Sequence, residues 1–183
     1  MMDENQNVTE DSVGSDYEAT GEIVNVNRTT VNRIEADLVR MSESSANEIY
    51  ASEVEIRQGM SVNVQAENFT LHNSAAIQVN AKQASVNSGG VVLLQAEQAD
   101  IDGSKIALMV SNSARIDNSR SGWMLARNVE SNSTHVGLLL AGNVVGTVEA
   151  VIDTPRAILA GMSAGVALGL MFILGRVLLR NKR

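Results

Sequence analysis

The sequence predicts an all-β fold: a single β-solenoid (β-helix) of about nine coils of fifteen residues, followed by one C-terminal transmembrane α-helix. Three observations predict this architecture. Residues of one kind return every fifteen positions between residues 19 and 151. Apolar residues within each repeat stand two positions apart, and an uncharged run long enough to span a bilayer lies near the end of the chain.

Four columns of residues carry the repeat and keep their character without an insertion. One column never holds a large side chain, and the other three are apolar, so all four are expected to face the core. Read in steps of fifteen, they run from Gly21 to Ala141, from Val24 to Val144, from Ile34 to Leu139 and from Val26 to Ile116. Each repeat is therefore predicted to form one coil, stacked on the next through backbone hydrogen bonds at about 4.8 Å.

Two features bend each coil. The alternation breaks between the small column and the next apolar one, as between Ala66 and Phe69, which indicates a corner. Small turn-forming residues such as Gly59, Ser74 and Gly89 indicate a second one. A corner in so short a coil leaves room for only a small side chain. An amphipathic helix does not fit, because apolar residues two apart do not follow a period of 3.6.

The ends of the solenoid differ from its middle. Residues 1–18 are acidic and poor in apolar side chains, and no basic residue precedes Arg28, so we expect a disordered arm; an acidic docking arm is the alternative. The opening residues do not have the pattern of a secretory signal. The net charge of −7 argues against a nucleic-acid partner, and the lack of cysteine excludes disulfides and thiolate metal sites.

Two outward columns change from polar to apolar along the chain. The first coils present residues such as Arg33, Glu48 and Gln65, whereas from Val91 onward the same columns are apolar. Strands that are apolar on both faces are usually covered on both faces, so these residues predict an interface between copies of the chain, with Trp123 as its anchor. The alternative is that part of the chain itself covers them. The predicted oligomer interface consists of Leu93, Leu108, Val110, Trp123, Leu125, Leu138 and Leu140.

After a linker at residues 152–156, residues 157–179 are predicted to form the transmembrane helix, and residues 180–183 a basic tail. Thr154 and Pro155 suit the N-cap and first position of that helix. Small residues at every fourth position predict close packing of two such helices in lipid. These transmembrane packing residues are Ala157, Gly161, Gly165 and Gly169. A buried soluble helix is the alternative.

The orientation in the membrane is predicted from charge and from the size of the flanking parts. A short tail crosses a bilayer more easily than a folded rod, so we expect a single-pass, tail-anchored protein with the rod in the cytoplasm. The basic residues Arg176, Arg180, Lys182 and Arg183 leave the opposite orientation open, because positive charge usually stays inside.

Catalytic chemistry is not predicted. No serine–histidine–aspartate set, phosphate-binding loop or close carboxylate pair can be assembled from the repeats, so we expect no enzyme and no cofactor. One turn column could hold a cation between coils, but its residues are typical of ordinary turns, so no metal site is predicted. That column contains Asn87, Asp102, Asp117 and Asn132.

Short coils with Val-x-Ala and Val-x-Ile steps after a polar arm resemble the bactofilins, polymer-forming β-helical cytoskeletal proteins of bacteria. The resemblance covers residues 21–146; the strict coil length and the C-terminal span depart from that family. The chain is also similar to uncharacterised bacterial membrane-anchored repeat proteins, through Ala-Gly-x-Val-x-Gly-x-Val at residues 141–148 and Asp-Thr-x-x-Ala-x-x-Ala-Gly at residues 153–161. That second resemblance implies no activity.

Together these features predict a membrane-anchored structural or scaffolding protein that assembles into a homo-oligomer. Its expected partners are the lipid bilayer and further copies of itself. The alternative is a display rod, a binding module that recruits a protein partner to the membrane through its polar coils or its acidic arm.

Overall fold

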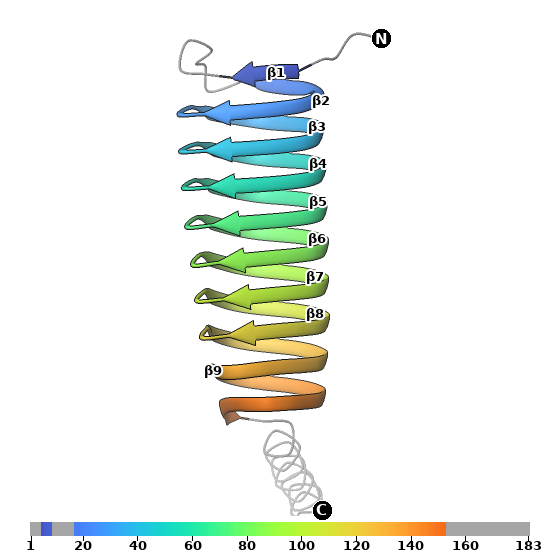
Figure 1. The fold of residues 1–183 in the computed structure, drawn as a ribbon, viewed down its shortest axis with the longest axis vertical. Helices are drawn as coiled ribbons and strands as arrows, with labels where there is room; N and C mark the ends of the chain where they lie inside the picture. Colours follow the sequence, from blue (N-terminus) through green and yellow to red (C-terminus); the bar gives the residue numbers. More distant parts are fainter. Residues whose placement is uncertain (1–4, 9–16, 153–183) are drawn as a thin grey trace, which may run out of the picture.

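The computed structural model of the chain describes residues 5–8 and 17–152. They form a rod built from one parallel sheet of nine strands, each paired with the next strand along the chain (Figure 1). The strands are β1 (Asn5–Val8), β2 (Glu18–Asn27), β3 (Thr30–Ser42), β4 (Ser45–Arg57), β5 (Met60–His72), β6 (Ala75–Asn87), β7 (Gly90–Asp102), β8 (Lys105–Asp117) and β9 (Arg120–Ile152).

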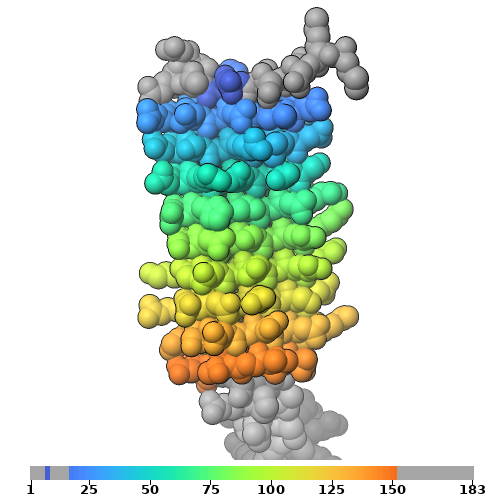
Figure 2. Space-filling model, viewed as in Figure 1, coloured from blue at the N-terminus to red at the C-terminus, as the bar shows by residue number. Residues whose placement is uncertain are grey.

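The predicted repeat of fifteen residues is the pairing register of the sheet. Val64 on β5 pairs with Val79 on β6, which pairs with Leu94 on β7, and the same offset holds from β2 to β9. Like residues therefore stack on like residues, and the coils pack directly on one another along the rod (Figure 2). The all-β solenoid is confirmed, with about eight turns.

The core is formed by the columns that the sequence predicts and by one more. The columns that contain Val39, Ile49 and Ile56 are buried along almost their whole length. The small column is half-buried at Ala36, and buried from Ala81 to Ala126. A further buried column was not predicted, because serine and alanine interrupt its apolar residues. It contains Val31, Ala46, Ser61, Ala76, Val91, Ile106, Ser121 and Val136.

The first corner follows the small column. Pairing between β4 and β5 runs from Glu48 to Ala51, skips Ser52 and resumes at Glu53, so the chain bends there. Because the bend brings the Ala51 position close to the coil axis, a larger side chain would lack room.

The turn at the other corner is built by a left-handed residue and a hydroxyl. One residue in each turn has φ between 47° and 64°; these are Arg28, Glu43, Gln58, Asn73, Ser88, Gly103, Asn118 and Ser133. The next residue is often a buried serine, which links neighbouring coils. The Ser74 hydroxyl donates to the His72 carbonyl oxygen at 2.6 Å and accepts from the Gly59 N–H at 3.0 Å. Side-chain hydroxyls thus complete the hydrogen bonding of the turns.

Ser61 and Ser74 provide a matched pair for a stability test. The Ser61 side chain is fully buried, and its hydroxyl has no hydrogen-bond partner among the described residues. Ser61→Ala should therefore raise the free energy of unfolding by about 1–2 kcal/mol, whereas Ser74→Ala should lower it by about 1–3 kcal/mol. Urea denaturation measures both. A loss of stability in Ser61→Ala would contradict the assignment of that hydroxyl as unpaired.

The last coil differs from the others, and the rod has about eight turns where nine were expected. Gly146 has a φ of 101°, and a Cβ there would clash with the Ser131 carbonyl oxygen. The prediction that Val144 faces the core is wrong: this side chain is 42 % exposed.

The first turn receives a short strand that was not expected in the acidic arm. β1 pairs in parallel with residues Ile23 to Val26 of β2, and Val8 is buried on the end of the core. The offset between β1 and β2 is eighteen residues, three more than the repeat. No residue of the arm has the period of the columns, so the repeat could not reveal this pairing.

Candidate interaction surfaces

Two surfaces on the rod stand out, and the first is an apolar face. We give this name to the outward side chains of Leu93, Leu108, Val110, Trp123, Leu125, Leu138 and Leu140 on β7, β8 and β9. Trp123 is 63 % exposed and Leu125 is 49 % exposed. The structure brings these residues together because Leu93 pairs with Leu108 and Leu108 with Trp123, while Val110 pairs with Leu125.

The apolar face continues toward the first coils through residues that the sequence analysis missed. Val62, Ile77 and Val92 are exposed one above the other in the column next to Leu93, and Met60 lies beside them. Their spacing of fifteen residues could have revealed them in the sequence, because a column of exposed apolar residues predicts an interaction surface even though it does not fill the core.

Below Val92 the same column becomes small. It holds Ala107, Gly122 and Gly137, each directly before a large residue of the apolar face. A Cβ on Gly122 would lie 2.6 Å from the Ala107 carbonyl oxygen, and one on Gly137 would lie 2.6 Å from the Gly122 carbonyl oxygen. The backbones of neighbouring coils therefore lie close together at Gly122 and Gly137, and neither glycine adds a side chain next to the apolar face.

In the first coils, the same outward columns carry charges that pair within the chain. An Arg33 amino group lies 3.6 Å from a Glu48 carboxylate oxygen, and the guanidinium carbon lies 4.8 Å from the centre of the Tyr50 ring. At the first corner, the Lys82 ammonium donates to Glu67 at 2.6 Å, and this hydrogen bond raises the pKa of Lys82. These pairs are exposed to solvent, so they contribute little to stability.

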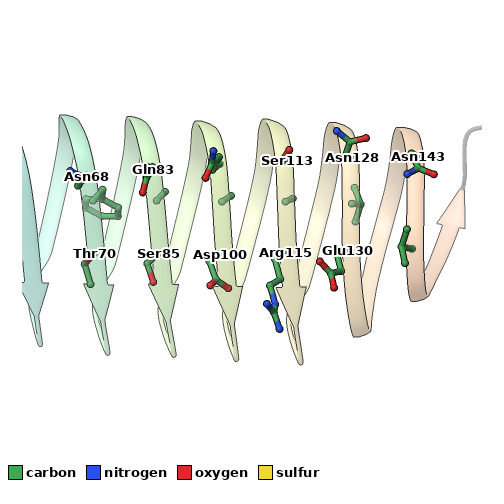
Figure 3. Close-up of a pocket in the computed structure, with 17 residues that line it drawn as sticks. Asn68, Thr70, Gln83, Ser85, Asp100, Ser113, Arg115, Asn128, Glu130 and Asn143 are labelled. Carbon is green, nitrogen blue, oxygen red and sulfur yellow. The ribbon is translucent and has the colours of Figure 1, made fainter.

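The second surface is a polar groove on another side of the rod. It has a volume of about 800 Å³ and runs along the rod from Asn68 on β5 to Asn143 on β9. Figure 3 shows two rows of side chains, one near the bend of the coils and one on the adjoining strand segments. The first row contains Asn68, Gln83, Gln98, Ser113, Asn128 and Asn143. The second contains Thr70, Ser85, Asp100, Arg115 and Glu130.

The floor of this polar groove lies between the two rows. It is formed by the strand segments around Phe69, Ala84, Ala99, Ala114 and Val129, whose side chains are buried. Short side chains at Thr70, Ser85 and Ser113 keep the groove open. Farther up the rod, the equivalent second-row positions hold Arg40 and Glu55, which form an ion pair at 3.8 Å, and the groove does not extend there. This groove was not predicted from the sequence, because the residues of each row are of types that are common on any solvent-exposed surface.

Two other predictions concern the transmembrane helix and metal binding. The transmembrane packing residues Ala157, Gly161, Gly165 and Gly169 lie outside the described residues. Within residues 5–8 and 17–152 there is no helix long and apolar enough to cross a membrane. In the same part of the chain, no three histidine, aspartate or glutamate side chains come close enough to hold a metal ion.

Comparison with known proteins provides no evidence about the fold or the function. No protein-family model, curated protein or solved structure matches the chain. The β-solenoid fold therefore rests on the structure and on the fifteen-residue repeat of the sequence.

Proposed function

We propose that this protein is a membrane-anchored structural or scaffolding rod that assembles into a homo-oligomer through its apolar face. One observation carries the proposal: Leu108, Trp123 and Leu125 are exposed side by side on consecutive coils. Scattered apolar residues are common on protein surfaces, but a contiguous patch of this kind usually marks an interaction site.

The form of the apolar face supports a second copy as the partner. In an interface with two-fold symmetry, a large residue of one chain meets a different position of the other chain, and the reverse contact is made as well. Trp123 next to Gly122, and Leu138 next to Gly137, provide a row of large side chains beside a row without side chains on the same face. Trp123 has the size and amphipathic character of an interface anchor.

The membrane part of the proposal rests on the sequence. Residues 157–179 contain one charged residue, Arg176, and the run is long enough to span a bilayer. The packing residues Gly161, Gly165 and Gly169 would bring two such helices together at the end of the rod that carries the apolar face. A kinship with the bactofilins is likewise a proposal, and coil architecture is its support.

Light scattering in detergent tests the assembly. The mass of the protein, with the detergent contribution subtracted, is compared between the full chain and a version that ends at Thr154. A defined oligomer in both means that the coils carry the interface, and an oligomer of the full chain alone means that the helix carries it. A monomer in both would refute the structural assembly.

Trp123→Glu tests the apolar face itself. A carboxylate at the centre of an apolar interface loses hydration without gaining a partner, so the dissociation constant should rise at least about 30-fold. Sedimentation of both proteins over a dilution series gives the constants, and circular dichroism checks that the β-structure is retained. Gln83→Glu is the matched control, since Gln83 is exposed in the polar groove, in a different column from the apolar face, and should leave assembly unchanged. An unchanged mass for Trp123→Glu would remove the apolar face from the interface.

A further inference from the structure

We propose that the polar groove is a binding site for a neutral linear oligosaccharide that lies along the rod axis. This inference is independent of the proposed assembly, because the groove and the apolar face are formed by different columns of the coils. It assigns the rod a ligand as well as a structural role.

The chemistry of the lining indicates a hydroxyl-rich ligand. Five of the six residues in the first row are amides, and Ser113 is the sixth. A side-chain amide both donates and accepts hydrogen bonds, as does the hydroxyl of Thr70 or Ser85 on the opposite row. Sugar hydroxyls also do both, so they can pair with the first-row amides and with the hydroxyls of Thr70 and Ser85 in either direction.

The charge of the lining argues against a polyanion. The groove has one cation, Arg115, between two anions, Asp100 and Glu130 on the neighbouring coils. A site for a nucleic acid or an acidic polysaccharide requires an excess of positive charge to balance the negative charge of the ligand. The groove has a small excess of negative charge.

The regularity of the groove favours a polymer of identical units. In the first row, an amide returns in five of the six coils, about every 4.8 Å along the axis. Extended peptides are recognised by main-chain hydrogen bonds to a free strand edge together with pockets for alternate side chains. Here the backbone of the floor is already paired from coil to coil, for example at Ala84 with Ala99, and the first row repeats amides without side-chain pockets of different kinds. A repeating sugar chain fits this arrangement better than a peptide sequence does.

The expected affinity is modest. Phe69 is the one aromatic residue of the lining, and its ring is buried in the core rather than presented to the groove. Without an aromatic surface on which sugar rings could stack, hydrogen bonds supply the affinity, and we expect dissociation constants of about 0.1–5 mM.

The test uses the full chain in detergent micelles and saturation-transfer NMR with four probes. Two are neutral hexasaccharides, cellohexaose and chitohexaose. The other two are an anionic hexamer of galacturonic acid and an extended glycine–serine peptide of similar length. We expect transfer to at least one neutral hexasaccharide and weaker transfer to the anionic and peptide probes. Lack of neutral-sugar binding at about 10 mM, or stronger binding of either other probe, would overturn the assignment.

Substitutions then locate the ligand. The double substitution Gln83→Ala and Gln98→Ala removes two adjacent amides and should weaken hexasaccharide binding at least about tenfold. Asn80→Ala with Gln95→Ala removes two exposed amides from the same strands outside the groove, and should leave binding unchanged. Equal effects of the two pairs would place the ligand elsewhere and overturn the proposal.

A blocking substitution guards against a folding defect. Thr70→Arg combined with Ser85→Arg places long side chains at both short positions of the second row, in a column where Arg40 and Arg115 already occur, whereas Arg115 by itself narrows the groove at one coil only. This variant should fold, keep its oligomeric mass and lose hexasaccharide binding. The mass by light scattering reports on assembly through the apolar face or the helix and not on the groove, so a failure of the groove and a failure of the assembly can be told apart.

Discussion

Removal of one whole coil, residues 75–89, is expected to leave a folded rod that is one turn shorter. The deletion joins Ser74 to Gly90, which takes the place of Ala75 in the register. Leu94 would then stack on Val64, and Ile101 on Leu71, so that each core column continues with residues of its own kind. Because each coil of a solenoid contacts only its neighbours, the rest of the rod keeps its contacts.

Deletion of one residue more, residues 75–90, should have a far larger effect. The coil at the junction is then one residue too short, and the following strands are shifted by one position, which turns their buried side chains toward solvent. We expect loss of the cooperative unfolding transition in this variant. In the whole-coil deletion, the urea m-value should fall by about one-eighth, in proportion to the surface that is no longer buried. Equal behaviour of the two deletions would contradict the register.

Phe69→Ala is expected to lower the free energy of unfolding by about 3–5 kcal/mol. Phe69 is the largest of the fully buried side chains, and its column holds only methyl groups in the three coils that follow, at Ala84, Ala99 and Ala114. These small neighbours cannot fill the cavity that the ring would leave, so little of the loss can be recovered by relaxation.

Urea denaturation of Phe69→Leu provides the control. Leucine restores most of the apolar volume, and Leu71 and Leu94 show that the core accepts it, so a loss of about 1–2 kcal/mol is expected. A loss below about 1 kcal/mol in Phe69→Ala would mean that the interior around Phe69 is not closely packed.

The sequence was most informative where a residue type is needed in every coil. The columns through Val39, Ile49 and Ile56 were predicted because a narrow core accepts only apolar side chains, and repetition makes that requirement visible. The turn was located at Gly59 and Ser74, next to the left-handed residues Gln58 and Asn73. Most of that left-handed column has no glycine, because the stacked turns hold the backbone there; its conformation could therefore not be read from residue type.

Features that depend on spatial combination were harder to predict. The polar groove begins where its second row changes from the long Arg40 and Glu55 to the short Thr70 and Ser85, a difference without meaning in any single repeat of the sequence. The strand β1 was missed because its pairing uses an offset of eighteen. The apolar face was predicted in its lower part, where the outward columns change from polar to apolar after Val91, but the exposed Val62 and Ile77 were not predicted.

The parallel register also determines how the rod responds to tension. Hydrogen bonds between coils lie along the rod axis, because each strand is paired with the strand fifteen residues later. A pull on the two ends therefore opens one coil at a time rather than shearing many strands together. Each released coil exchanges a rise of about 4.8 Å for an extended chain of about 50 Å. Under tension, such a rod can therefore lengthen coil by coil. The weakest coil limits the force that the molecule can transmit.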